Sequence, residues 1–409
     1  MPVAIEEDAA QDVCPFPFSR SEEPLMPPPE YAALRVESPA TRVRMWNGDH
    51  AWIFTRYEDV RAILASPDFS AVPSKPGYPT LTPARKSSVT NYNSFITMDP
   101  PEHGIYRRMI TKEFTVKRMD ALRPHVQQVT DELIDAMEAK GRPADLVEGL
   151  AGPLPSIVIS MMLGVDNSYH REMETLGQKR NNIQGDPSGT MAATQRMEEI
   201  IESVLTAKEQ DPGEGEDLLK RLVIDYIRPG HLAHIDAVRM ASLLYLAGHE
   251  TTTNQIALGT LTLLQNPDQL AKLKADPSLI PLAVEEMLRF NTIVQYNSAR
   301  VAVADVEING HQIKAGEGVY ALLTAANHDP AAFECPAQFD VARQGNPHVA
   351  FAFGIHQCLG QSLARMELAV VFETLLRRWP NMHLAVPFDQ VEFKNEQLVH
   401  GVRHLPLNW

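Results

Sequence analysis

Cys358 is the residue with the clearest capacity for chemistry, because of the segment in which it stands. Residues 351–360 read Phe-Ala-Phe-Gly-Ile-His-Gln-Cys-Leu-Gly, so Gly354 and Gly360 bracket the cysteine and a helical pattern begins near Gln361. A helix start presents unpaired N–H groups and partial positive charge, which favour the thiolate, the form that binds a metal. Flanking glycines let the backbone approach a flat ligand closely. The segment therefore indicates a haem-thiolate loop, although a lone cysteine is more commonly a packed, inert thiol.

A second group of residues with chemical potential lies in the middle of a long helical pattern and reads Ala247-Gly248-His249-Glu250-Thr251-Thr252. Glycine inside a helix costs about 1 kcal/mol relative to alanine, and adjacent threonines add to that cost. We expect Gly248 and the threonine hydroxyls to open a notch where a ligand lies against the backbone. Glu250 and Thr251 then form an acid and alcohol pair that relays protons into the notch. A helix packed through its small residues, with Glu250 solvated, is equally consistent with these residues alone.

Two further pairs are weaker signals on their own. Glu286 and Arg289 are spaced i, i+3 on one predicted helix and can pair, as many surface residues do with little gain in stability. His103 and Arg107 are spaced i, i+4 and can reach one anionic group from the same helix face. A solvated basic face is the simpler interpretation of this second pair.

The elements that position these residues follow from hydrophobic periodicity and turn signals. A helix over Ile235–Gln265, about 46 Å long at 1.5 Å per residue, carries the Glu250 group across the domain. Residues 66–97 are rich in proline and are expected to form a long functional loop. The other predicted elements are helices over Tyr31–Arg35, Tyr57–Ala65 and Gln361–Arg378, strands at Thr41–Met45 and Ala51–Thr55, at least four helices between Pro101 and Arg228, helices opening at Pro267 and Pro277, strands within 299–325 around an Asn309-Gly310 turn, and strand-like residues at the end of the chain.

Composition restricts the class of protein. The chain has 409 residues, of which 44% are hydrophobic and 22% charged, and its net charge is −15. So acidic a chain is a poor candidate for binding nucleic acid or an anionic membrane. Three scattered cysteines suit a reducing compartment, the acidic N-terminus lacks the features of a signal peptide, and nowhere do ~18 apolar residues follow one another. We therefore expect a cytoplasmic protein.

The signals occur in one order on one chain, and together they resemble the cytochrome P-450 family of the soluble bacterial type. The resemblance covers the chain from about residue 30 to its end. The family motif Phe-x-x-Gly-x-x-x-Cys-x-Gly is matched by Phe351, Gly354, Cys358 and Gly360, Glu-x-x-Arg by Glu286 and Arg289, Ala-Gly-x-Glu-Thr-Thr by Ala247 to Thr252, Asp-Pro-Pro-Glu-His by Asp99 to His103, and Phe-Asp-x-x-Arg by Phe339, Asp340 and Arg343. One departure is His328, in Asn327-His328-Asp329-Pro330, where the family commonly has arginine.

The resemblance implies a mainly α fold with small antiparallel β-sheets, in which a long central helix and the cysteine loop lie on opposite faces of a haem. It implies a single haem domain over residues 1–409, with an extended proline-rich lead-in at 1–30. Cys358 becomes the metal ligand, the axial thiolate of haem b, which is iron protoporphyrin IX. Glu250 and Thr251 become the catalytic residues, with Thr251 hydrogen-bonding dioxygen and Glu250 supplying protons through water.

Further roles come from the same resemblance, residue by residue. The other cofactor-binding positions are His103, Arg107, Ala247, Gly248, Arg300, Phe351, His356 and Gly360. Four of these, His103, Arg107, Arg300 and His356, match positions that bind the two haem propionates, where charge-assisted hydrogen bonds are strong. Phe351 is expected to pack beside the thiolate. Glu286, Arg289 and Arg343 match a buried network that holds the cysteine loop.

The implied function is a monooxygenase that inserts one oxygen atom of dioxygen into a small or medium apolar substrate and reduces the other to water. The chain has no Gly-x-Gly-x-x-Gly fingerprint for flavin or nicotinamide, so electrons are expected from a separate ferredoxin or flavodoxin with its reductase. A basic patch of Arg107, Arg108, Lys112 and Arg365 is the candidate docking site, and we expect a monomer. The alternatives are a nitric oxide reductase or peroxide-driven haem-thiolate enzyme and, in another class, a non-catalytic haem sensor.

The substrate itself is not predicted beyond this class. By resemblance, its pocket is lined by the loop 66–97, helices between about 167 and 205, Leu243, Leu244 and Ala247, and Val294 to Asn297. Asn91, Tyr92 and Asn93 suggest a polar contact at the tip of the loop, or equally a solvated turn.

Overall fold

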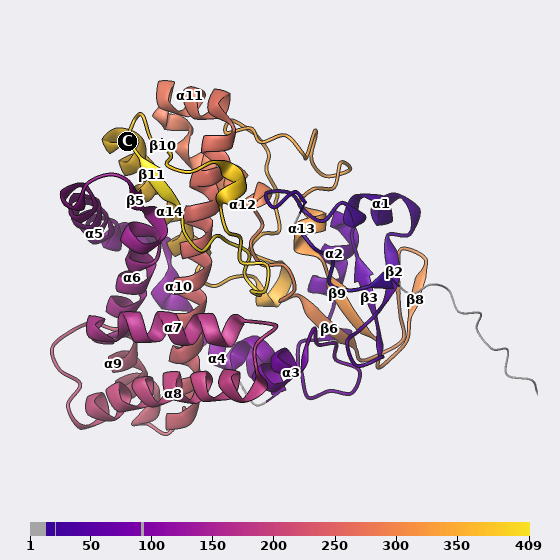
Figure 1. Ribbon diagram of the computed structural model, residues 1–409. Helices are drawn as coiled ribbons and strands as arrows, with labels where there is room; N and C mark the ends of the chain where they lie inside the picture. Colours follow the sequence, from indigo (N-terminus) through magenta and orange to yellow (C-terminus); the bar gives the residue numbers. More distant parts are fainter. Residues whose placement is uncertain (1–13, 21, 91–93) are drawn as a thin grey trace, which may run out of the picture.

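Helix α10, His234–Gln265, is the axis of the computed structural model, which describes residues 14–20, 22–90 and 94–409. At 32 residues it is about 48 Å long and runs through the middle of the molecule (Figure 1). Its side chains are buried almost continuously from Ala237 to Leu263. Ala247, Gly248 and Thr251 are exceptions, since they remain partly or fully exposed. The predicted helix Ile235–Gln265 is therefore confirmed to within one residue.

Other helices surround α10 and share its core. Helices α6 and α14 pack beside it, α5 packs against both of these, and α7 and α8 cross the lower part of α10 in the view of Figure 1. The bounds are α4 Glu102–Thr111, α5 Val116–Lys140, α6 Pro153–Leu163, α7 His170–Asn181, α8 Pro187–Gln210, α9 Leu218–Leu222, α11 Pro267–Ala275, α12 Ile280–Phe290 and α14 Gln361–Arg378. One large cluster of buried apolar side chains joins these helices, and two smaller clusters lie around the sheet. No helix among the described residues is long and apolar enough to cross a membrane.

The largest sheet lies beside the helical part, on the right of Figure 1, and has the strand order β1-β2-β3-β9-β6-β4. Its β1–β2 and β3–β9 pairs are parallel, so this sheet is mixed rather than antiparallel as predicted. The strands are β1 Cys14–Pro15, β2 Ala40–Arg44, β3 His50–Phe54, β4 Phe69–Ser70, β5 Ala144–Asp145, β6 Ala299–Ala302, β7 Val306–Ile308, β8 His311–Ile313, β9 Gly318–Ala321, β10 His383–Leu384 and β11 Pro406–Asn408. The smaller sheets, β10-β11-β5 and β7-β8, are antiparallel.

The predicted turn at Asn309-Gly310 is confirmed, because both residues have positive φ, 48° and 83°, between β7 and β8. Such φ values at both central positions suit the tight hairpin turns that asparagine and glycine favour. Helices α1, Glu30–Glu37, and α2, Tyr57–Ala65, also lie where the sequence places them.

Two local predictions are wrong. Residues 66–97 are not a structureless loop, since they contain β4 and helix α3, Pro83–Thr90. The Thr82 hydroxyl accepts a hydrogen bond from the Arg85 N–H, and Pro83 opens the helix, so a start signal was present among the prolines. Residues Leu323–Ala326 form helix α13 instead of continuing the strands. Asn91, Tyr92 and Asn93 lie outside the described residues.

Candidate active site

The cysteine loop is fixed by its own backbone and by helix α2. The Cys358 N–H donates to the Phe351 carbonyl at 2.8 Å, and Gly360 precedes the first residue of α14. Gly354 has φ of 73°, and a Cβ there would lie 2.3 Å from the carbonyl oxygen of Leu64 on α2. Glycine is therefore required at 354 both for its conformation and for the close approach of two backbones. A Cβ on Gly360 would meet nothing within 4 Å, so the backbone at this position faces open space.

That open space is a cavity of about 330 Å³, which lies between the cysteine loop and the centre of α10. Cys358 and Gly360 line one side, and Ala247 and Thr251 line the other. The predicted residues that line this single cavity are Arg107, Ala247, Gly248, Glu250, Thr251, Arg300, Phe351, His356, Cys358 and Gly360. His103 joins them indirectly, because its ring centroid lies 4.3 Å from that of His356. The structure thus brings together the residues that sequence motifs alone could only place in order.

A group of nitrogen donors lies at one edge of the cavity. Nε2 of His103 and Nδ1 of His356 are buried and have no hydrogen-bond partner among the described residues. Arg107 uses one nitrogen on the Gln357 carbonyl at 2.6 Å, and Arg300 uses one on the Ala299 carbonyl at 2.7 Å. Each guanidinium therefore has further N–H donors to offer. This donor set fits a cofactor that carries two carboxylates.

The same donors repel one another in the absence of an anion. Burial, with the charges of Arg300 and His103, lowers the pKa of His356 to about 3. Burial and the nearby Arg107 lower the pKa of His103 as well. Carboxylates placed among these groups would favour their charged forms, since an opposite charge nearby stabilises a cation.

The predicted effect of the helix start on Cys358 is present but is outweighed by burial in the free thiol. Burial raises the pKa of Cys358, although the Gly360 N–H and the positive charges of Arg107 and Arg365 oppose that shift. Removal from water disfavours a thiolate more than these groups favour it. A bound metal cation would favour the ionised form of this sulfur.

The centre of α10 has no break in its helical hydrogen bonding, so the expected notch is not an interruption of the helix. Instead the Thr251 hydroxyl donates to the Ala247 carbonyl at 2.6 Å, which satisfies the hydroxyl within the helix. A Cβ on Gly248 would lie 3.1 Å from the side chain of Ile159, so this glycine also allows α6 to pack closely against α10.

Glu250 is buried, which excludes the alternative of a solvated carboxylate on the far side of the helix. Its Oε2 accepts a hydrogen bond from the Asn181 amide at the end of α7. Burial raises the pKa of Glu250, while the Asn181 hydrogen bond and the charge of Lys394 oppose the shift. Lys394 in turn donates to Asn254 at 3.1 Å, one turn beyond Glu250 on α10. Sequence reasoning missed these partners, because no local pattern links residues 181, 250 and 394.

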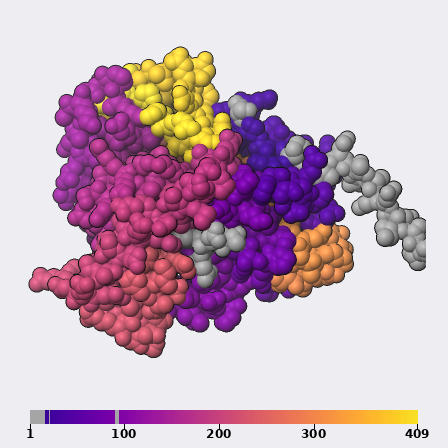
Figure 2. Space-filling view, turned by 60° about the horizontal axis from the view of Figure 1, so that its bottom comes forward, coloured from indigo at the N-terminus to yellow at the C-terminus, as the bar shows by residue number. Residues whose placement is uncertain are grey.

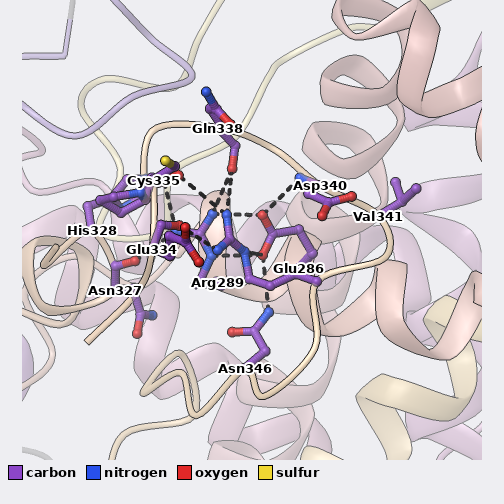
Figure 3. Close-up of polar contacts among 12 residues, drawn as sticks. Glu286, Arg289, Asn327, His328, Glu334, Cys335, Gln338, Asp340, Val341 and Asn346 are labelled. Carbon is purple, nitrogen blue, oxygen red and sulfur yellow. Dashed lines mark hydrogen bonds and ion pairs between the residues drawn. The ribbon is translucent and has the colours of Figure 1, made fainter. Parts of the chain in front are cut away.

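The Glu286–Arg289 pair is not a surface pair, since both side chains are fully buried. Arg289 donates to Glu286 through Nε at 2.8 Å and Nη2 at 2.7 Å. Its Nη1 donates to the carbonyls of Asn327 and Pro336, and Nη2 also donates to that of Gln338. Glu286 also accepts from Arg343 Nε, the Asp340 N–H and the Asn346 amide, as Figure 3 shows for the labelled partners. The network connects α12 to residues 327–346, the segment that leads into the cysteine loop.

His328, the departure from the family motif, lies beside this network. It is buried, and its Nδ1 lies 3.1 Å from the Thr324 carbonyl. Burial and the charge of Arg289 lower the pKa of His328 to about 3, so the ring is neutral at physiological pH. A neutral imidazole adds no second positive charge next to the buried Arg289.

Phe351 lines the cavity, and the Arg365 guanidinium lies 4.6 Å from its ring centroid. Its backbone carbonyl, rather than its ring, makes the hydrogen bond to the Cys358 N–H. The shielding of the sulfur by this ring stays a prediction.

Comparison with known proteins agrees with the geometry. A family model described as Cytochrome P-450 matches residues 183–402. Cytochrome P-450-SU2 of Streptomyces griseolus is 41% identical over 405 residues, which cover 99% of this chain and 99% of that protein. The chain belongs to the cytochrome P-450 family. The Vitamin D3 dihydroxylase of Streptomyces griseolus is 39% identical and covers 97% of each chain.

A solved cytochrome P-450, the crystal structure of GfsF, matches the fold with a TM-score of 0.90 and 41% identity, over 97% of this chain and 100% of that one. The predicted mainly helical cytochrome P-450 fold is therefore confirmed. So is the predicted enzyme class: this cytochrome P-450 is a monooxygenase that acts on organic molecules of small or medium size. Family membership implies a haem ligated by a cysteine thiolate, together with separate redox partners.

The buried network generates the first prediction. Glu286→Gln should lower the free energy of unfolding by about 3 kcal/mol or more, because it leaves two arginines beside a neutral group. Glu199→Gln is the matched control, since Glu199 pairs with Arg196 at the same i, i+3 spacing but on the surface. It should change stability by less than about 1 kcal/mol. Urea denaturation of the haem-loaded proteins measures both, and equal effects would refute the special role of Glu286.

Proposed function

We propose that the Cys358 thiolate would hold the iron of a haem b and that this monooxygenase inserts one oxygen atom of dioxygen into an apolar substrate. The observation that carries the proposal is a single cavity with Cys358 on one side, Ala247 and Thr251 on the other, and unsatisfied nitrogen donors at its edge. When bound there, haem supplies the activation of dioxygen that monooxygenation requires. His103, Arg107, Arg300 and His356 are the proposed partners of its propionates.

Thr251 and Glu250 are the proposed proton-handling residues. The Thr251 hydroxyl proton is engaged by the Ala247 carbonyl, which leaves the oxygen lone pairs free to accept a hydrogen bond from a group in the cavity. Thr251 can thus hold a proton donor in place against the α10 wall, or rotate to donate directly. Glu250 is suited to carry protons inward, because burial raises the pKa of its carboxyl and the Asn181 amide fixes its orientation.

The remaining wall of the cavity is the proposed substrate site. Leu243, Leu244, Ile293, Val294 and Leu398 make much of it apolar, in keeping with the predicted substrate class. Screening organic compounds for a haem spin-state change is the direct way to identify the substrate. The single domain over 1–409, the monomeric state and the cytoplasmic location stay predictions.

The ligand assignment predicts a spectroscopic result. The reduced protein with carbon monoxide should show the strongly red-shifted absorption band of thiolate-ligated haem, and Cys358→Ala should remove it. Cys335→Ala is the control, because Cys335 is the exposed free cysteine and lies outside the cavity. Persistence of the band in Cys358→Ala would exclude this ligand. The sensor alternative would show the band but no turnover with substrate and electrons.

The proton-handling assignment predicts uncoupling. Thr251→Ala should lower product formed per electron several-fold while electron consumption continues, because the hydroxyl that orders proton donors is gone. Thr253→Ala is the matched control, since Thr253 makes the same bond to the carbonyl four residues earlier, at 2.9 Å to His249, but does not line the cavity. Equal yields in both variants would refute the assignment and favour the peroxide-driven or nitric oxide reductase alternatives.

The predicted basic patch is only partly available to a redox partner. Lys112 pairs with Asp225 at 2.8 Å, Arg365 pairs with Glu285 at 2.6 Å, and Arg107 faces the cysteine loop. Arg108 on α4 and Lys112 are the exposed cations of the four, and Lys112 is already paired. We propose that Arg108, supported by Lys112, attracts an acidic ferredoxin or flavodoxin.

This docking proposal predicts a change in kinetics. The double variant Arg108→Glu, Lys112→Glu should be reduced more slowly at low salt, and its rate should depend less on ionic strength. A control of equal net charge is Arg171→Glu, Lys179→Glu on the exposed face of α7. Stopped-flow reduction at several salt concentrations compares the two. If the two double variants showed identical salt dependence of the reduction rate, the redox partner would dock at a different surface.

A further inference from the structure

The cavity has more positive charge than the haem accounts for. Four arginines line it, Arg85, Arg107, Arg180 and Arg300. The proposed propionate partners use Arg107 and Arg300, which leaves two arginines without an assigned role. Glu250 is the sole carboxylate among the described residues that line the cavity; it accepts a hydrogen bond from Asn181 and interacts electrostatically with Arg180, so Arg85 is the cation that it leaves unbalanced.

Arg85 is the more informative of these two arginines. It comes from α3, the helix that sequence analysis missed, and its Nη2 donates to the Asn297 amide oxygen at 2.8 Å. That partner is neutral, and no carboxylate among the described residues pairs with Arg85. A guanidinium drawn partly out of water is costly unless it meets a negative charge. Asn297 therefore orients the guanidinium without neutralising it.

Arg180 brings a second positive charge to the same place from a different element. It lies near the end of α7, whereas Arg85 lies on α3, and α3 packs against α8, the neighbour of α7. Figure 2 shows this face, on which the magenta α7–α8 layer borders the purple segment that contains α3. Burial and the charge of Arg180 lower the pKa of Arg85 to about 10, opposed by Tyr78. Two cations held together in a cavity wall make a site for an anion.

The apolar part of the cavity wall determines the rest of the ligand. The α10 side chains Leu243 and Leu244 and the segment at Ile293 and Val294 offer apolar contacts and no further charge. A molecule that satisfies both regions has an apolar body and one anionic group. The apolar body is then the part that extends towards Cys358 and the haem.

We infer that the substrate of this enzyme bears a carboxylate, and that Arg85, oriented by Asn297 and assisted by Arg180, binds it. The inference rests on the proposed function, because it names the substrate class of that same cavity. Arg85 is on this account a specificity-determining residue, and oxidation occurs on the apolar body rather than next to the acid group.

The test uses matched ligand pairs on the haem-loaded enzyme. Each pair is a carboxylic acid and its methyl ester, on linear, aromatic and terpenoid skeletons, and binding is followed by the spin-state change. In the unaltered protein at least one acid should bind about 10- to 100-fold more tightly than its ester, as expected for a charge-assisted hydrogen bond. Arg85→Gln should abolish that preference while leaving ester binding unchanged, and Arg85→Lys should restore part of it.

Lys86→Gln is the matched control, because Lys86 is an exposed cation on the same helix and does not line the cavity. The inference is overturned if no acid binds better than its ester, if Arg85→Gln weakens acid and ester alike, or if that variant loses haem, which would assign Arg85 to the cofactor. The carbon monoxide spectrum distinguishes a failure of the proposed function from a failure of this inference. Absence of the red-shifted band in the unaltered protein refutes the proposed function, whereas a normal band without acid preference refutes this inference alone.

Discussion

The geometry of the site depends on the buried carboxylate of Glu286. It neutralises Arg289 and Arg343 and accepts hydrogen bonds from Asp340 and Asn346, so that one carboxylate organises donors from a segment that has no regular structure of its own. Buried charges of this kind are stable only when every polar group is satisfied. The network therefore holds residues 327–346 in one arrangement. This arrangement determines where the cysteine loop begins.

The position of the loop matters because the other side of the cavity is rigid. Helix α10 crosses the molecule without a break, packed by α6 through the contact of Gly248 with Ile159. A ligand between α10 and Cys358 therefore meets two walls that are set independently, one by helix packing and one by an ion network. The cavity between these two walls is bordered by the open space beside Gly360 and by the exposed Ala247.

Electrostatics gives the cavity its chemical character. Nitrogen donors gather around His103 and His356 and at Arg85, yet the protein as a whole is acidic, with a net charge of −15. Burial raises the pKa values of the Cys358 thiol and the Glu250 carboxyl, which resist ionisation without a partner. The cations in the wall and the buried acids beside them form a site whose charges are balanced by the ligand that binds there.

Much of the protein could be predicted from its sequence, because strong local patterns determine it. Helices α2 and α14 have the predicted bounds, α10 differs by one residue, and the Asn309-Gly310 turn follows from the φ values that these residues tolerate. The motifs around Cys358, Thr251 and Glu286 identified the family, because each residue type is demanded by its chemistry at a defined spacing. Only the tertiary structure decided that Glu250 meets Asn181, that Gly248 contacts α6 as well as the cavity, and that Arg85 lines the same cavity as Cys358. Those contacts join residues that are far apart in the chain. Their energies depend on burial and on the distances between charged groups in the folded protein, which a local sequence pattern does not contain.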